Sequence, residues 1–160
     1  MTETESAGNL LAVILDTNPS QASFIGQNPA RFNQWIDGAL AFLNSHLCLN
    51  QTNEATLISS GSSSCSFLYP CKDTELPEAI DGQFEGFRKV EVAVRTKLAQ
   101  ILAQELQGPI VRQSLVAGGL CMALSYINRY FDLYIINFQV EIRRKLSNFI
   151  TFVFFGLYRF

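Results

Sequence analysis

The sequence has no excess of basic charge and no long apolar run. It contains 12 Lys and Arg residues against 14 Asp and Glu, for a formal net charge of −2. A protein that wraps nucleic acid needs a basic face for the phosphates, so we expect no direct nucleic-acid binding. No apolar run reaches the roughly eighteen residues of a membrane-spanning helix. The stretch 1–9 lacks the positive start of a secretory signal. We therefore expect no membrane association and a cytosolic or nuclear protein.

Cysteine is sparse and histidine occurs once. Cys48, Cys65, Cys71 and Cys121 show neither the CxxC spacing of a zinc site nor a dense disulfide framework. We expect reduced thiols without a chemical role, although Cys65 and Cys71 could meet across a strand and its turn. A nucleophile pair of His46 and Cys48 would lack an oriented third member, so we interpret His46 as a residue of a helix end.

What the chain does contain is alternating strand and helix patterns, with 48% hydrophobic residues to build a core. A continuous apolar run such as 10–15 is typical of a strand buried on both faces. Apolar residues at helical spacing follow Asn28 and Pro29 as far as Leu47, which predicts an amphipathic helix. The stretches 54–59 and 66–69 are predicted strands. A strand, a helix and a strand in this order form a parallel crossover unit, so the fold class is α/β.

The second half of the chain is predicted to be helical. One apolar face runs from Phe84 to Leu102, and a further helix begins near Ser114 with Leu120, Ala123, Leu124 and Ile127 as its buried stripe. Gly118 and Gly119 each cost this helix about 1 kcal/mol in propensity. That cost indicates close packing against a strand or another backbone.

The end of the first strand is the position where chemistry is expected. Asp16, Asn18 and Ser20 follow the strand at spacings of two, so their oxygen atoms can converge on a hard cation. This arrangement resembles the metal-ion-dependent adhesion site of von Willebrand A domains, whose pattern is Asp-x-Ser-x-Ser. Ser114 is the candidate for the distal Thr of that site. The middle Ser is replaced by Asn18 and no second carboxylate is found, so we expect no bound metal.

Four blocks of sequence, in order, resemble the family of the 34-kDa subunit of the general transcription and DNA repair factor TFIIH. They are 10–19, 44–53, 67–70 and 115–124. The resemblance implies an incomplete von Willebrand A-like, Rossmann-like doubly wound sheet with flanking helices. It also implies a nuclear scaffold in transcription initiation by RNA polymerase II and in nucleotide excision repair. The partners that it implies are sibling TFIIH subunits, especially the other A-domain and zinc-binding subunit.

The resemblance ends near residue 131, where the family continues with further strands, helices and a zinc-binding tail. We therefore divide the chain into residues 1–131, the N-terminal part of an A-like domain, and a divergent hydrophobic tail, 132–160. No zinc or other cofactor is expected in this chain. We expect the outer edge of the first strand to be unpaired or covered by 133–138. Alternatively, residues 132–160 continue the preceding helix, and we favour this helical tail, with Ile150 and Val153 on its apolar face.

Three functional classes remain open. The first is the non-catalytic scaffold. The second is a cation-dependent ligand-binding A-domain module, which needs a complete set of oxygen ligands around Asp16. The third is a small enzyme, which needs an activated nucleophile or a phosphate loop. The turn Gly61–Ser64 lacks the Gly-Lys-Ser/Thr ending of such a loop. A truncated product of splicing or of an imprecise gene model, without function, is a further alternative.

Overall fold

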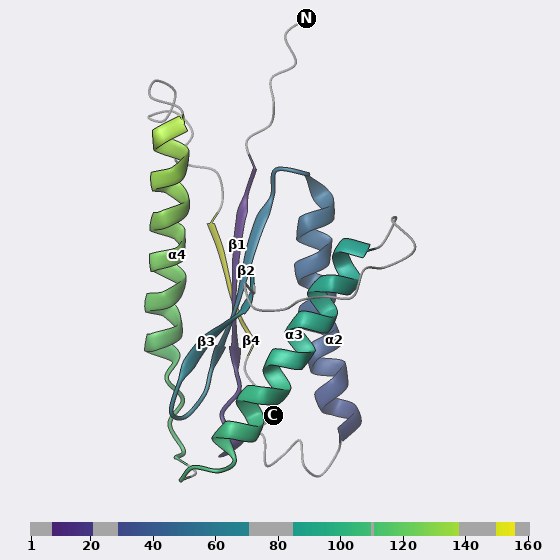
Figure 1. Cartoon of the computed structure of the whole chain (residues 1–160), viewed down its shortest axis with the longest axis vertical. Helices are drawn as coiled ribbons and strands as arrows, with labels where there is room; N and C mark the ends of the chain where they lie inside the picture. Colours follow the sequence, from purple (N-terminus) through teal and green to yellow (C-terminus); the bar gives the residue numbers. More distant parts are fainter. Residues whose placement is uncertain (1–7, 21–28, 71–84, 110, 138–149, 156–160) are drawn as a thin grey trace, which may run out of the picture.

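The computed structural model describes residues 8–20, 29–70, 85–109, 111–137 and 150–155. In these residues, the strands form one mixed sheet with helices on both sides (Figure 1). The elements are β1 (Leu10–Asp16), α2 (Pro29–Leu49), β2 (Glu54–Ser60), β3 (Cys65–Tyr69), α3 (Glu85–Glu105), α4 (Val116–Asn137) and β4 (Ile150–Phe155). The α/β fold class and the first three strands are confirmed.

The sheet has the strand order β3-β2-β1-β4. β1 pairs in parallel with both β2 and β4, whereas β3 runs antiparallel to β2. β1 therefore lies inside the sheet with a helix layer on each side. This position explains why its sequence is apolar at every residue from Leu10 to Leu15 instead of alternating.

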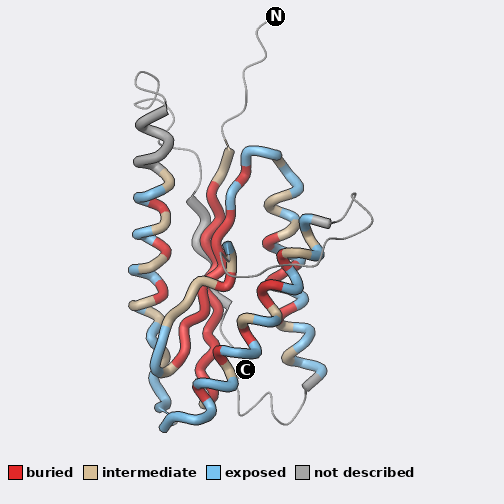
Figure 2. The backbone as a smooth tube through the Cα atoms, in the orientation of Figure 1, coloured by how far each residue is buried: buried red, intermediate tan, exposed pale blue. Residues whose placement is uncertain are grey.

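The helices are divided between the two faces of the sheet. α2 and α3 cover one face and α4 covers the other (Figures 1 and 2). Because successive strand side chains point to opposite faces, β1 contributes to both layers. Leu11, Val13 and Leu15 pack with α2 and α3, while Ala12 and Ile14 pack with α4.

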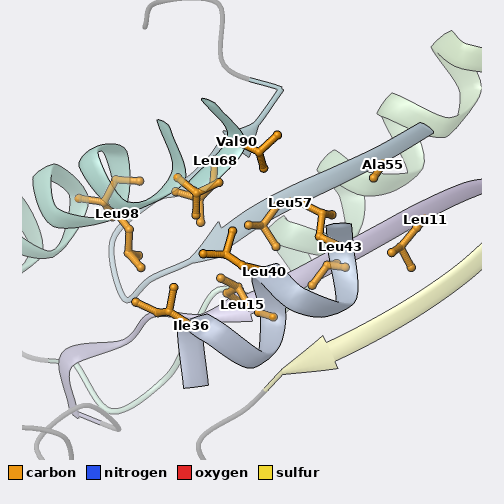
Figure 3. Close-up of a cluster of buried hydrophobic side chains, with 14 residues drawn as sticks. Leu11, Leu15, Ile36, Leu40, Leu43, Ala55, Leu57, Leu68, Val90 and Leu98 are labelled. Carbon is orange, nitrogen blue, oxygen red and sulfur yellow. The ribbon is translucent and has the colours of Figure 1, made fainter. Parts of the chain in front are cut away.

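The larger core lies between the sheet and the pair α2 and α3 (Figure 3). It is built from aliphatic side chains of both layers, among them Leu15, Leu43, Leu57, Leu68, Val94 and Leu98, all of which are almost fully buried. Trp35 and Phe32 pack against this cluster but are only partly buried, with ring centroids 5.8 Å apart. The predicted apolar faces of α2 and of the described part of α3 are confirmed.

The α4 face has a smaller core, made of Ala12, Ile14, Ile58 and Ala123. A Cβ on Gly119 would lie 3.1 Å from the Cγ2 of Ile14. The predicted close packing of the glycine pair is therefore confirmed. The predicted buried stripe of α4 is only half right.

Ala123 and Ile127 are buried, but Leu120 and Leu124 are 42% and 46% exposed. The close approach of the glycines turns one narrow stripe of the helix toward the sheet. The two leucines lie outside that stripe, on the outer side of α4.

The C-terminal part of the chain departs most from our expectations. α4 continues across residue 131 to Asn137, so the helical alternative is confirmed for 132–137 and a strand over 133–137 is wrong. The predicted tail at 138–149 lies outside the described residues. Ile150 and Val153 do not belong to a helix, because they lie in β4, which pairs with β1 from Leu10 to Leu15. The expectation that the outer edge of β1 is unpaired is therefore also wrong.

No helix in the described residues is both long enough and apolar enough to cross a membrane.

Candidate functional site

Three loops meet at the carboxyl end of the parallel pair β1 and β2. Asp16 and Ser60, the last residues of the two strands, are paired in register. The amide of Thr17 donates to the carbonyl of Ser60 at 2.9 Å, and the amide of Leu115 donates to the carbonyl of Gly61 at 2.9 Å. The loop after β1, the β2–β3 turn and the α3–α4 connection are thus joined at the edge where open α/β sheets bind ligands.

Asp16 and Ser114 are brought together, although 98 positions separate them in the sequence. The hydroxyl of Ser114 donates to Oδ1 of Asp16 at 2.7 Å. The same oxygen accepts a hydrogen bond from the backbone amide of Asn18 at 3.1 Å. Asp16 is only 8% exposed. The expected convergence of these two residues is present in the structure.

Asn18 is fully buried, and both ends of its amide are occupied. Its Oδ1 accepts a hydrogen bond from the backbone amide of Ser20 at 2.8 Å, and its Nδ2 donates one to the carbonyl of Val111 at 3.0 Å. Asn18 therefore ties the loop after β1 to the α3–α4 connection.

The residues at this edge do not fit a divalent cation well. Hard cations take six or more oxygen ligands and depend on carboxylates for charge. Asp16 is the single carboxylate of the predicted set, and one of its oxygens already accepts two hydrogen bonds. Within the described residues, no three His, Cys, Asp or Glu side chains are grouped as metal ligands. The buried hydroxyls of Thr17 and Ser60 have no hydrogen-bond partner there, but they are neutral and supply no charge.

A second carboxylate at this end of the sheet was not predicted. Glu105, the last residue of α3, is only 4% exposed and faces the turn Gly61–Ser64. The amides of Ser62, Ser63 and Ser64 donate to its two oxygens at 3.1, 3.1 and 3.2 Å. The hydroxyls of the same three serines donate to it as well, that of Ser63 at 2.6 Å. We call this arrangement the Glu105 cradle.

The hydrogen bonds of the cradle hold Glu105 in its charged form. Burial by itself would raise the pKa of the carboxyl group above 4.5, because it disfavours the charge. The hydroxyls and amides of Ser62 and Ser63 outweigh burial and lower the pKa to about 2. Gly61 makes the approach possible, since a Cβ there would lie 2.5 Å from Oε1 of Glu105. The sequence Gly-Ser-Ser-Ser suggested a turn, but no local pattern points to an acceptor more than forty residues away.

His46 has a structural position at the opposite end of the sheet. Its Nε2 lies 3.1 Å from the carbonyl oxygens of both Asn9 and Glu54. A nitrogen that faces two acceptors carries hydrogen, so His46 donates to the starts of β1 and β2. Asn53 donates from Nδ2 to the carbonyl of His46 at 2.8 Å and strengthens the same junction. The pairing of His46 with Cys48 as a nucleophile gains no support from these contacts.

The cysteines that the structure describes are separate and free. Cys48 and Cys121 are exposed, and the thiol of Cys65 donates to the carbonyl of Leu115 at 3.3 Å. Burial is the main cause of a raised pKa at Cys65, which disfavours the reactive thiolate. Cys71 lies outside the described residues, and Cys65 is not engaged in a disulfide.

A pair of ionisable groups also links β2 and α4. Burial raises the pKa of Glu54, although a hydrogen bond with Tyr126 opposes the shift. Burial, followed by the charge of Glu54, raises the pKa of Tyr126 to about 12. A phenol with this pKa keeps its proton at neutral pH and is unsuited to act as a general base there.

Comparisons with known proteins agree with this arrangement. The model of the family "Transcription factor Tfb4" matches residues 8–146. A subunit of the general transcription and DNA repair factor IIH, TFB4 of Arabidopsis thaliana, is 34% identical over an alignment of 131 residues that covers 77% of this chain and 42% of the relative. The TFB4 of Debaryomyces hansenii is 30% identical over an alignment of 148 residues that covers 78% of this chain and 38% of the relative. The chain thus spans about two fifths of the length of the curated relatives it matches.

A solved structure has the same fold. The crystal structure of the TFIIH p34 N-terminal domain superposes with a TM-score of 0.62 and 19% sequence identity, covering 95% of this chain and 66% of that one. At this identity the likeness establishes the fold, which is von Willebrand A-like. The family model covers most of the chain, beyond the boundary that we placed at residue 131. The chain belongs to the transcription factor Tfb4 family.

Proposed function

We propose that this chain acts as a non-catalytic scaffold subunit of the TFIIH core in the nucleus. In this role it would serve transcription initiation by RNA polymerase II and nucleotide excision repair. The observation that carries the proposal is the family match over residues 8–146, together with relatives named as subunits of the general transcription and DNA repair factor IIH.

The arrangement of side chains at the carboxyl edge supports a role without catalysis. An enzyme needs a nucleophile or base that is free to reach a substrate. Asp16 accepts bonds from Ser114 and Asn18, and Glu105 accepts bonds from the turn beside it. Both carboxylates therefore serve to join loops.

The partners that we propose are sibling TFIIH subunits, in particular the other A-domain and zinc-binding subunit. The outer side of α4 supports a role in protein contacts, because Leu120 and Leu124 are exposed there. We propose that the chain needs no zinc of its own for this role. Its described cysteines are too scattered to form a zinc site.

Affinity purification from nuclear extract tests the proposal. A tagged full chain is expected to enrich TFIIH subunits over an untagged extract. The variant Leu43→Asp is the control, because a charge in the fully buried core should unfold the chain and abolish the enrichment. If the folded wild-type chain, checked by circular dichroism, enriches no TFIIH subunit, the scaffold proposal fails. The alternative of a truncated product without function would then be favoured.

The second candidate is a cation-dependent ligand-binding module, and the convergence of Ser114 on Asp16 favours it. Titration calorimetry of the full chain with Mg²⁺ and Mn²⁺ separates the two candidates. A saturable site that disappears in Asp16→Ala would support the module. The incomplete set of charged ligands leads us to expect no such site.

A further inference from the structure

Several hydrogen bonds attach the α3–α4 connection, and Glu105 just before it, to the sheet and its loops. Ser114 donates to Asp16, and the carbonyl of Val111 accepts from Asn18. The amide of Leu115 donates to the carbonyl of Gly61. At the start of the connection, Glu105 lies in the cradle formed by the β2–β3 turn.

We infer that these contacts form a cation-independent latch, in which hydrogen-bond donors of the protein, in place of a metal ion, stabilise two carboxylates. The latch fastens the α3–α4 connection to the carboxyl end of β1 and β2. Its function is to set the start of α4 relative to the sheet. The inference rests on the geometry of this edge and does not depend on the proposed function.

The distribution of hydrogen bonds is the first argument. A buried carboxylate requires compensation by a cation or by several donors. Glu105 receives six hydrogen bonds from three consecutive serines, which leaves it no free oxygen for a metal. Asp16 receives one bond from a backbone amide and one from a hydroxyl. The donors thus take the place that a cation would have in a complete adhesion-type site.

The position of α4 is the second argument. Leu115 directly precedes the helix, and both its amide and its carbonyl are engaged, the amide with Gly61 and the carbonyl with the thiol of Cys65. One turn later, Gly118 and Gly119 approach Cys65 and Ile14 so closely that a Cβ would lie 3.1 Å from a neighbouring atom at either position. Packing this close tolerates little displacement of the helix start, so a fixed anchor is required here.

Hydrogen exchange of the full-length chain tests the latch. Ser114→Ala removes the hydroxyl that binds Asp16 and leaves the backbone conformation accessible. We expect the amides of Asn18 and Leu115 to exchange about tenfold faster or more, the effect of losing a hydrogen bond to a charged acceptor. Ser125→Ala is the matched control, because that hydroxyl donates to the carbonyl of Cys121 within α4 itself. It should leave both amides unchanged.

The same proteins are then measured with Mg²⁺, with Mn²⁺ and with a chelator, and no change is expected. The double variant of Asp16→Ala and Ser114→Ala should exchange no faster than Asp16→Ala alone, since both remove the same bond. If Asp16→Ala fails to fold, Ser114→Ala and the metal series still decide. The latch would be overturned if the amides of Asn18 and Leu115 exchanged at the same rate in Ser114→Ala as in the Ser125→Ala control. Protection that increases with Mn²⁺ in the wild type and not in Ser114→Ala would overturn its independence from cations.

Discussion

The two faces of the sheet are covered in different ways. Two helices cover one face, and large aliphatic side chains from β1, β2, α2 and α3 pack together there (Figure 3). One helix covers the other face, with a small buried cluster and two glycines at close approach. The first face excludes water mainly by the volume of its side chains, whereas the second depends on the close approach of the α4 backbone to side chains of the sheet. Substitutions should therefore act on the two faces by opposite mechanisms, cavities on the first and overpacking on the second.

The largest effect is expected from a cavity on the α2 and α3 face. Leu43→Ala should lower the free energy of unfolding by about 2–5 kcal/mol, because Leu43 is fully buried in the larger core. Urea denaturation measures the loss. Leu49→Ala is the matched control in the same helix, since Leu49 is 81% exposed and should change stability by roughly 0.5 kcal/mol or less. Equal losses in the two variants would mean that the core is assigned to the wrong face of α2.

The next effect concerns the Glu105 cradle, which joins the end of α3 to the turn between β2 and β3. Glu105→Gln should lower the free energy of unfolding at neutral pH by about 1.5–3 kcal/mol, the contribution of hydrogen bonds to a charged group. The control Glu91→Gln removes an exposed ion pair with Arg95 and should cost less than about 1 kcal/mol.

The effect of Glu105 should depend on pH in a defined direction. Its pKa in the folded chain is about 2, below the ordinary value of 4.5. Its stabilisation is therefore complete above about pH 4.5 and is lost as the pH falls toward 2. The difference between wild type and Glu105→Gln, followed by urea denaturation, should shrink over this range. A difference that stays constant down to pH 2 would contradict a depressed pKa.

Overpacking on the α4 face should have a smaller effect. Gly119→Leu places a side chain against Ile14 and should cost about 1–3 kcal/mol. Gly38→Leu in α2 is the control, because a Cβ at Gly38 meets nothing within 4 Å. That variant should stabilise the chain by about 0.5–1 kcal/mol through helix propensity. Thermal denaturation of both variants should give shifts of opposite sign, and shifts of the same sign would remove the distinction between the two faces.

The smallest effect is expected on the outer side of α4. Leu124→Gln should change the free energy of unfolding by roughly 0.5 kcal/mol or less, since Leu124 is 46% exposed. Ile127→Ala, one turn further along the helix, is the contrast. It is only 4% exposed and should cost about 2 kcal/mol or more. A large loss of stability in Leu124→Gln would show that both sides of α4 are buried.

Most strands and helices were predictable because their patterns are local. The apolar run 10–15 and the helical spacing after Pro29 correspond to β1 and α2. β4 was missed because Ile150 and Val153 also fit a helical spacing that begins earlier in the chain. The short run Ile-Thr-Phe-Val-Phe-Phe, rich in β-branched and aromatic residues, contained the competing indication of a strand. Length and composition should have decided between the two.

The candidate site divides in the same way. The sequence by itself determined the α/β class, the position of Asp16 after a buried strand, and the need for close packing at Gly118 and Gly119. These follow from residue type and spacing, which act over a few residues. Only the tertiary structure decided that Ser114 would reach Asp16 and that Glu105 would enter the turn of serines. Each of those bonds joins residues far apart in the chain, and their geometry exists only once the sheet register and the helix positions are set.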